Sequence, residues 1–143
     1  MTESNRAAGA VDRPADPRLP ITVRGRKAVL DASWCIDCDL VTILRSYRCA
    51  RCGGELAPTT ISGEGKLWSW TVVRIPVVDR QPPYTLGYVD LKDGPRLLCH
   101  MVDGDGRGGE VRGLGTGDAA TIVGVNDLGD PVATTASQGT GPV

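Results

Sequence analysis

The sequence contains no phenylalanine, a single histidine, and only three tryptophans and three tyrosines in 143 residues. It also lacks a long apolar run, since no stretch approaches the roughly 20 residues that span a membrane as a helix. The first ten residues, MTESNRAAGA, lack the apolar core of a signal peptide. We therefore expect a cytoplasmic chain, in a compartment that keeps thiols reduced.

A strong positive charge is absent as well. Residues 1–58 carry nine Lys or Arg against seven Asp or Glu, a balance of +2, and residues 59–143 carry seven against ten, a balance of −3. Neither half has the positive field on which sequence-independent binding to phosphate backbones depends. The charge pattern thus disfavours a nucleic-acid-binding protein, which we keep as the alternative function.

No segment shows the periodicity of an amphipathic helix, whereas 19 glycines and 10 prolines indicate short strands joined by turns. This composition predicts an all-β protein. The four cysteines of two CxxC pairs, Cys35 and Cys38 then Cys49 and Cys52, stand out against it. The ten residues between the pairs, DLVTILRSYR, alternate like two short strands of a hairpin, which would bring both pairs together.

Four thiolates around one ion are the ligand set of structural zinc, and they leave no open position for water or substrate. We therefore predict a structural zinc site with these four cysteines as metal ligands. Iron in a rubredoxin-like redox site uses the same four ligands, so we keep iron as an alternative metal. A two-disulfide framework would need an oxidising compartment, and thioredoxin-type chemistry would need one CxxC at the start of a helix.

The second half of the chain predicts a small Greek-key barrel of the OB type, with a plain antiparallel sandwich as the other arrangement. Alternation places Trp68, Trp70 and Val72 on one face of the first strand. A tryptophan pair of this kind lies in the core or at a module interface more often than it forms a platform for stacking bases. The five expected strands cover residues 66–75, 84–91, 95–102, 118–125 and 131–136.

The remaining candidate sites are weak. The loop DGDGRGGE has Asp103 and Asp105 where a calcium loop has ligands, but Arg107 stands at the third ligand position. Cys99 and His100 are neighbours on a strand, so their side chains point to opposite faces and do not form a nucleophile–base pair. We predict no independent catalytic site, hence no catalytic residues.

Three segments together resemble a known family: GEGKLWSWTVVRIPV, QPPYTLGYVDLKDGPRLLCHMVD and LGTGDAATIVGVNDLGDPV, following the four-cysteine segment. The chain resembles the acyl-CoA-associated OB-fold family with a rubredoxin-like zinc ribbon, also called the domain of unknown function 35 family, over roughly residues 34–132. Two segments depart from the family pattern. VTILRSY replaces a proline-rich stretch between the CxxC pairs, and residues 20–33 favour strand where many members are helical.

The scarcity of large apolar groups predicts a disordered N-terminal segment over 1–18 and a flexible tail over 138–143. Between them we predict a zinc ribbon over 19–58 and an OB-fold over 59–137, an order that the resemblance supports. The resemblance also implies a non-catalytic accessory subunit of a thiolase-like acyltransferase or condensing enzyme, which supports complex assembly and acyl-CoA handling. The expected partners are that enzyme, in a hetero-oligomer, and acyl-CoA at the shared interface, without nucleic acid or membrane.

Two surfaces are candidates for these contacts. Bulky residues at the tip of the ribbon hairpin, Ile43, Leu44 and Tyr47, are more consistent with an interface than with packing, because the hairpin has little core of its own. The basic residues of the barrel are candidates for the phosphates of CoA, although scattered basic residues on strands usually form a solvated face. They are Lys66, Arg74, Arg80 and Arg96.

Overall fold

The computed structural model describes residues 21–24, 27–43 and 46–136. These residues form nine strands and no α-helix, so the described part contains no helix that could cross a membrane. The all-β class predicted from the composition is confirmed. The predicted N-terminal segment, 1–18, and the predicted tail, 138–143, lie outside the described residues.

The first four strands form one sheet around β2, which spans Lys27–Cys35. β1 (Ile21–Arg24) and β3 (Val41–Thr42) pair antiparallel with β2 at its start and its end, and β4 (Leu56–Ser62) pairs with it from Val29 to Cys35. Residues 20–33, predicted as strand, thus form a strand pair rather than one strand. β4 was not predicted, and it runs without a break across position 58, where the predicted boundary lies.

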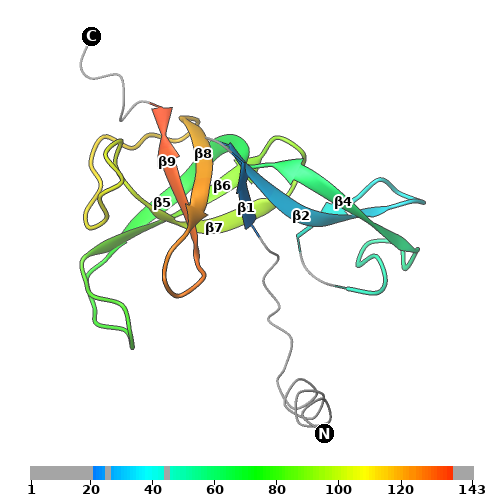
Figure 1. The fold of residues 1–143 in the computed structure, drawn as a ribbon, viewed down its shortest axis with the longest axis horizontal. Coiled ribbons are helices and arrows are strands. Elements are labelled where there is room, and N and C mark those ends of the chain that lie inside the picture. The colour runs from blue at the N-terminus through cyan, green and yellow to red at the C-terminus, as the bar shows by residue number, and fades with distance from the viewer. Residues whose placement is uncertain (1–20, 25–26, 44–45, 137–143) are drawn as a thin grey trace, which may run out of the picture.

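The other five strands close into a barrel in the order β5-β6-β7-β9-β8, which confirms the predicted five-stranded OB-type barrel (Figure 1). All neighbours are antiparallel except β7 and β9. The strands are β5 (Glu64–Val73), β6 (Tyr84–Leu91), β7 (Arg96–Met101), β8 (Ala119–Val125) and β9 (Pro131–Thr135). Closure leaves the barrel without the unpaired edges that invite aggregation.

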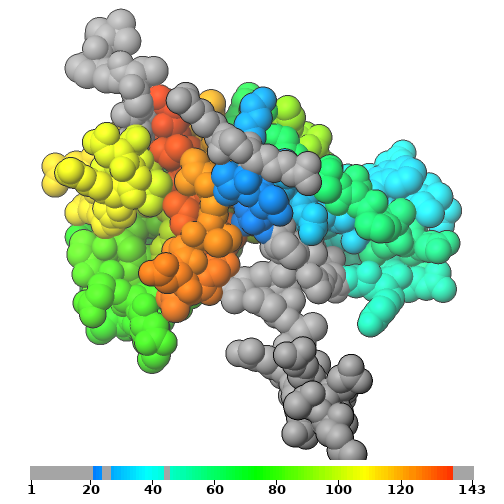
Figure 2. Space-filling view, in the orientation of Figure 1, coloured from blue at the N-terminus to red at the C-terminus, as the bar shows by residue number. Residues whose placement is uncertain are grey.

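A single buried cluster joins the sheet to the barrel. Ala28 and Leu30 of β2 pack in the same core as Leu67, Val89 and Ile122 of the barrel. In Figure 2 the orange residues of the β8–β9 region adjoin the blue residues of the first two strands, and the surface continues to the cyan residues at the far right. The sheet therefore covers one side of the barrel as well as carrying the cysteines at its outer end.

Gly63 is the single residue that connects β4 to β5. Its amide donates to the carbonyl of Ala28 (3.1 Å), and its carbonyl accepts from the amide of Ile122 (2.8 Å). A Cβ atom at Gly63 would lie 2.9 Å from Cβ of Ile122, so no larger residue fits without movement. One residue thus bonds the sheet to the barrel through its backbone.

The first barrel strand carries a bulge at Trp68. Leu67 lies opposite Val89 and Ser69 lies opposite Tyr88, so Trp68 is the extra residue, and the alternation changes phase there. The prediction that Trp68 and Trp70 share a face assumed an unbroken strand and does not hold across the bulge. Neither ring is in the core, since Trp68 is 47% exposed and Trp70 37%.

Candidate metal centre

Each CxxC pair forms a tight turn with the same hydrogen-bond pattern. In the first turn, the amide of Asp39 donates to the carbonyl of Cys35 (3.0 Å). In the second turn, the amide of Gly53 donates to the carbonyl of Cys49 (2.9 Å). Asp39 and Gly53, each directly after the second cysteine of its pair, have φ angles of 63° and 74°. Glycine adopts this left-handed conformation freely and aspartate is among the few other residues that tolerate it.

The strands place these two turns face to face. Cys35 is the last residue of β2, and Leu56, its partner in register, begins β4 three residues after the second turn ends at Gly53. The loop between the pairs differs from the predicted hairpin. Among its described residues, Val41–Thr42 pairs with β2 and Arg48 forms an isolated bridge with Glu55, so the two expected arms do not pair with each other. The four thiols come together as predicted, but the pairing of β2 with β4 positions them.

The four sulfur atoms all lie within 4.8 Å of one another. The shortest separations are 3.5 Å between Sγ of Cys35 and Cys52 and 3.6 Å between Sγ of Cys38 and Cys49. A tetrahedral ion with metal–sulfur bonds of about 2.3 Å places its ligands roughly 3.8 Å apart. The arrangement therefore fits one metal ion, and all four cysteines are free of disulfides.

Backbone groups around the sulfurs complete the cluster. The amide of Arg51 donates to Sγ of Cys49 and that of Gly54 to Sγ of Cys52, each at 3.4 Å. A Cβ atom at Gly54 would collide with the carboxylate of Asp37 and lie 3.1 Å from Sγ of Cys52. Glycine at this position lets the backbone approach the sulfurs and donate to them.

The thiols do not ionise as a set without a cation. The amide of Cys52, aided by further hydrogen bonds, lowers the pKa of Cys49 to about 6. The amide of Gly54 lowers the pKa of Cys52, but the neighbouring thiols, Cys35 first, and desolvation outweigh it and raise that pKa to about 12. One proton thus leaves readily while another is retained, which is the behaviour of coupled sites. A divalent ion supplies the charge that four thiolates require.

The three residues predicted at the hairpin tip have different environments. The side chain of Tyr47 is 98% exposed. Ile43, by contrast, is partly buried and packs against the common core. It therefore has the packing role that was the alternative to an interface. Leu44 lies outside the described residues.

Three of the four basic residues considered for phosphate contacts are in ion pairs. Arg74 pairs with Glu110 (2.8 Å), Arg80 with Asp130 (2.6 Å), and Arg96 with Asp90. Lys66 lies in β5. A neighbouring carboxylate thus balances the charge of each of these three arginines. Arg96 also stacks on the ring of Trp68, 3.6 Å from its centroid, and Trp68 meets Tyr88 edge to face.

The weaker candidates have structural roles. Cys99 is buried, and burial raises its pKa to about 12, which makes it a poor nucleophile at neutral pH. His100 points the other way and lies 3.3 Å from Asp130. Asp103 accepts hydrogen bonds from the amides of Asp105 and Arg107, so its carboxylate closes the glycine-rich loop by itself.

Comparisons with known proteins agree with the resemblance stated from the sequence. Residues 59–116 match the family model described as the C-terminal OB-fold domain of ChsH2. A DUF35 domain-containing scaffold protein of Methanothermobacter thermautotrophicus (strain Delta H) is 30% identical over 80 residues, which are 53% of this chain and 60% of that protein. The chain thus spans about 60% of the length of this curated relative.

A solved structure described as the Ltp2-ChsH2(DUF35) aldolase is similar over 75% of this chain and 84% of that chain, with a TM-score of 0.59 and 22% identity. At that identity the likeness concerns the fold. Together with the clustered cysteines, the three matches confirm the resemblance to the proteins of this family that combine a zinc ribbon with an OB-fold.

Proposed function

We propose that this chain is a non-catalytic scaffold subunit of a thiolase-like acyltransferase or condensing enzyme, and that it supports assembly and acyl-CoA handling in the cytoplasm. The observation that carries the proposal is the closed four-cysteine cluster, in which every ligand position of one ion is filled by protein. Such a site stabilises a fold and leaves no coordination position for a substrate.

Two further observations support a scaffold rather than an enzyme. Within the described residues, the one histidine contacts a carboxylate and an aromatic ring, and the one cysteine outside the cluster is buried. The curated relative is named a scaffold protein. The similar solved structure is described as an aldolase made of Ltp2 and ChsH2, which is a precedent for this fold within an enzyme complex.

The decisive experiment is co-expression with a candidate partner, a thiolase-like or condensing enzyme sought among the genes next to the one for this chain. We expect the two chains to elute together in size-exclusion chromatography with light scattering. We also expect the enzyme to lose most of its turnover of acyl-CoA when this chain is left out. Separate elution, with equal turnover of the enzyme alone, contradicts the proposal.

We further propose zinc as the resident ion, held by Cys35, Cys38, Cys49 and Cys52. The donor set is that of structural zinc sites, in which binding contributes roughly 10–16 kcal/mol of apparent free energy in small domains. Elemental analysis of the purified, colourless protein should give one zinc per chain. A red protein containing iron would instead favour a rubredoxin-like redox centre.

One observation favours a second function, nucleic-acid binding. Trp68 and Tyr88 are exposed side by side on the barrel with Arg96 stacked on the indole, as on surfaces that stack bases. The pairing of Arg96 with Asp90 argues against it, because a stacking platform also needs unpaired cations for the backbone. A gel shift with single-stranded oligonucleotides at low salt separates the two functions, since only the second gives tight, salt-sensitive binding.

A further inference from the structure

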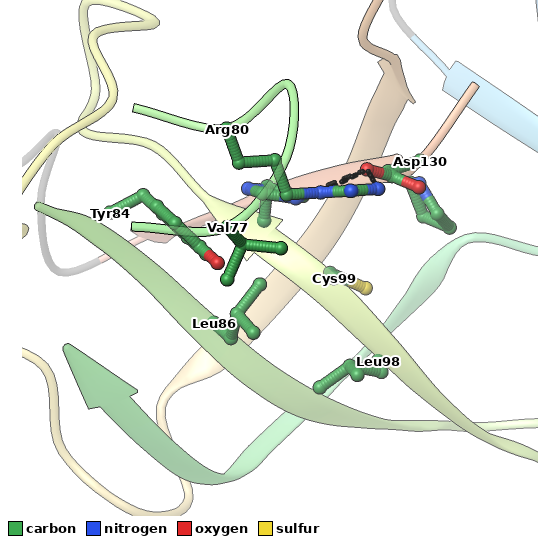
Figure 3. A pocket seen from close by; sticks show the side chains of 9 residues that line it. Val77, Arg80, Tyr84, Leu86, Leu98, Cys99 and Asp130 are labelled. Atoms are coloured by element: carbon green, nitrogen blue, oxygen red, sulfur yellow. Dashed lines mark hydrogen bonds and ion pairs between the residues drawn. The ribbon is translucent and has the colours of Figure 1, made fainter. Parts of the chain in front are cut away.

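A pocket of about 280 Å³ lies on the outer face of β6 and β7, apart from the four-cysteine cluster. Its wall is mainly apolar, and Figure 3 shows Leu86 and Leu98, from the two strands, below Val77, which comes from the β5–β6 loop. Asp130, in the β8–β9 connection, and Pro131, the first residue of β9, close the opposite side. Three consecutive segments and one remote segment therefore build one concave site.

The position is that of the ligand site of many OB-folds. These barrels bind ligands on the face of their second and third strands, between the loop that joins the first two strands and the loop that joins the last two. Here those strands are β6 and β7, and both loops extend from the same end of the barrel (Figure 1). The pocket residues come from these four elements.

A fixed polar group forms one end of the pocket. Oδ2 of Asp130 accepts two hydrogen bonds from Arg80, from Nε (3.2 Å) and Nη2 (2.6 Å), and lies 3.3 Å from Nε2 of His100. The side chain of Asn126 holds the turn before Asp130, because its Oδ1 accepts from the amides of Leu128 and Asp130. The guanidinium is thus anchored on one edge and cannot swing away from the pocket.

The polar end offers donors and carries no net charge. Across the described ranges, no hydrogen bond involves Nη1 of Arg80 or the hydroxyl of Tyr84, and Figure 3 shows that hydroxyl directed toward Val77. The positive charge of Arg80 is cancelled by Asp130, at a site where their side chains are only 32% and 17% exposed. A ligand therefore meets hydrogen-bond donors without a compensating charge for an ion.

We propose that this pocket binds a compact, uncharged, mainly apolar molecule through one carbonyl oxygen. The oxygen accepts from Arg80 and Tyr84, and the apolar body packs on Val77, Leu86 and Leu98. A carboxylate or an ammonium group binds less well, because the Arg80–Asp130 pair leaves no opposite charge to match it. The site goes beyond the proposed function, and it is present whether or not a partner enzyme binds.

Three probes of similar shape test the chemical class: cyclohexanecarboxamide, cyclohexanecarboxylate and cyclohexylammonium. Each is titrated into the metal-loaded full chain, and the methyl signals of Leu86 and Leu98 are followed by NMR. We expect the amide to shift both signals with a Kd of about 1 mM or below, which is reasonable for a ligand of about nine heavy atoms. We expect the two ions to bind at least about tenfold more weakly.

Variants locate the site. Leu98→Trp fills the pocket at a half-exposed position and should abolish the amide shifts, whereas Val78→Trp, on a residue that is 80% exposed and outside the pocket, should not. Tyr84→Phe should weaken the amide about two- to tenfold, the usual effect of one hydrogen bond. Circular dichroism melts verify that each variant is folded.

Two results would overturn the proposal. One is the absence of shifts at Leu86 and Leu98 with the amide. The other is tighter binding of the carboxylate, which would make the pocket an anion site. Neither result depends on a partner enzyme, so the pocket and the scaffold function fail or hold separately.

Discussion

At the scale of single residues, two positions with left-handed backbone give the metal centre its symmetry. Asp39 and Gly53 let each chain segment turn back after its second cysteine, so the four sulfurs point to one centre. The cysteine spacing alone predicted that they meet. The equivalence of the two turns was partly readable, because glycine after a CxxC is a turn signal and aspartate a weaker one.

The first expected outcome concerns Cys49→Ser. Because a hydroxyl is a poor ligand for a soft site, we expect metal content to fall from about one ion per chain to near zero and residues 34–56 to lose protection from amide exchange. Much of the barrel should keep its protection. Cys99→Ala is the control, since this thiol lies outside the cluster and its loss should leave metal content unchanged. An unchanged metal content and melting temperature in Cys49→Ser would rule out a structural site.

The polar end of the pocket shows where residue-level prediction stops. Arg80 and Asp130 are 50 residues apart and have no motif in common. Only the closure of the barrel brings their loops together, so no local pattern marks the pair. The sequence indicated only that His100 does not pair with Cys99, and the contact of His100 with Asp130 was missed for the same reason.

The second expected outcome concerns the pH dependence of Asp130. Desolvation acts to raise its pKa, but the hydrogen bond and charge of Arg80 outweigh it, and the pKa is lowered. A carboxyl with a lowered pKa stabilises the fold above its unfolded pKa of about 4, and this contribution is lost as the pH falls through the folded value.

We therefore expect Asp130→Asn to lower the free energy of unfolding by about 1 kcal/mol at pH 7, a magnitude limited by partial exposure of the pair. At about pH 3, below the unfolded pKa, the cost should be smaller. Urea titrations at the two pH values measure both. Asp127→Asn, at an exposed position of the same turn, is the control and should change stability little at either pH. A cost for Asp130→Asn that is the same at both pH values would argue against an ionised Asp130.

At the scale of elements, the five barrel strands were predictable, whereas the bulge in β5 and the strand β4 were not. β6 was predicted with its observed bounds, 84–91, because buried and exposed residues alternate along its length. The phase change at Trp68 was invisible, since a bulge depends on the register of the partner strand. β4 was missed because Pro58 and a run of small polar residues weaken its pattern, while β2 supplies its hydrogen bonds.

The third expected outcome concerns the junction between β4 and β5. Gly63→Ala places a methyl group 2.9 Å from Cβ of Ile122 and 3.3 Å from the carbonyl of Ala28, neither of which can rotate away. We expect destabilisation by about 1–3 kcal/mol, typical of overpacking. Differential scanning calorimetry measures it. Gly108→Ala is the matched control, because nothing lies within 4 Å of the added methyl group. Equal melting of the two variants would show that the junction tolerates movement.

At the scale of the whole molecule, the metal centre and the pocket are built on a common core but on different surfaces. The cysteines lie at the outer end of the sheet, and the pocket lies on the barrel face of β6 and β7. The order of ribbon and barrel was predictable from the cysteine positions and the glycine-rich segments. Their shared core was not, because packing between distant segments leaves no local pattern in sequence.

The fourth expected outcome concerns the partner surface at the hairpin. Tyr47 is 98% exposed, so it makes almost no packing contribution, and Tyr47→Ala should leave the melting temperature unchanged. If the hairpin docks on the enzyme, loss of this ring should weaken the complex at least tenfold, as for a typical aromatic hot spot. Binding is measured by biolayer interferometry with the co-expressed enzyme. Ile36→Ala, at another exposed apolar position in the first CxxC turn, is a control for the specificity of the surface. Unchanged affinity in Tyr47→Ala would place the docking surface elsewhere.

The path of β2 has a consequence for how such genes recombine. One end of this strand contributes Ala28 and Leu30 to the barrel core, and the other end supplies Cys35 to the metal centre. A crossover at position 58 would cut β4 in two and separate Ile61 from the strand it pairs with. We therefore expect a chimaera joined at position 58 to be destabilised, whereas one that exchanges only the loop between Cys38 and Cys49 should keep the shared core and the four metal ligands.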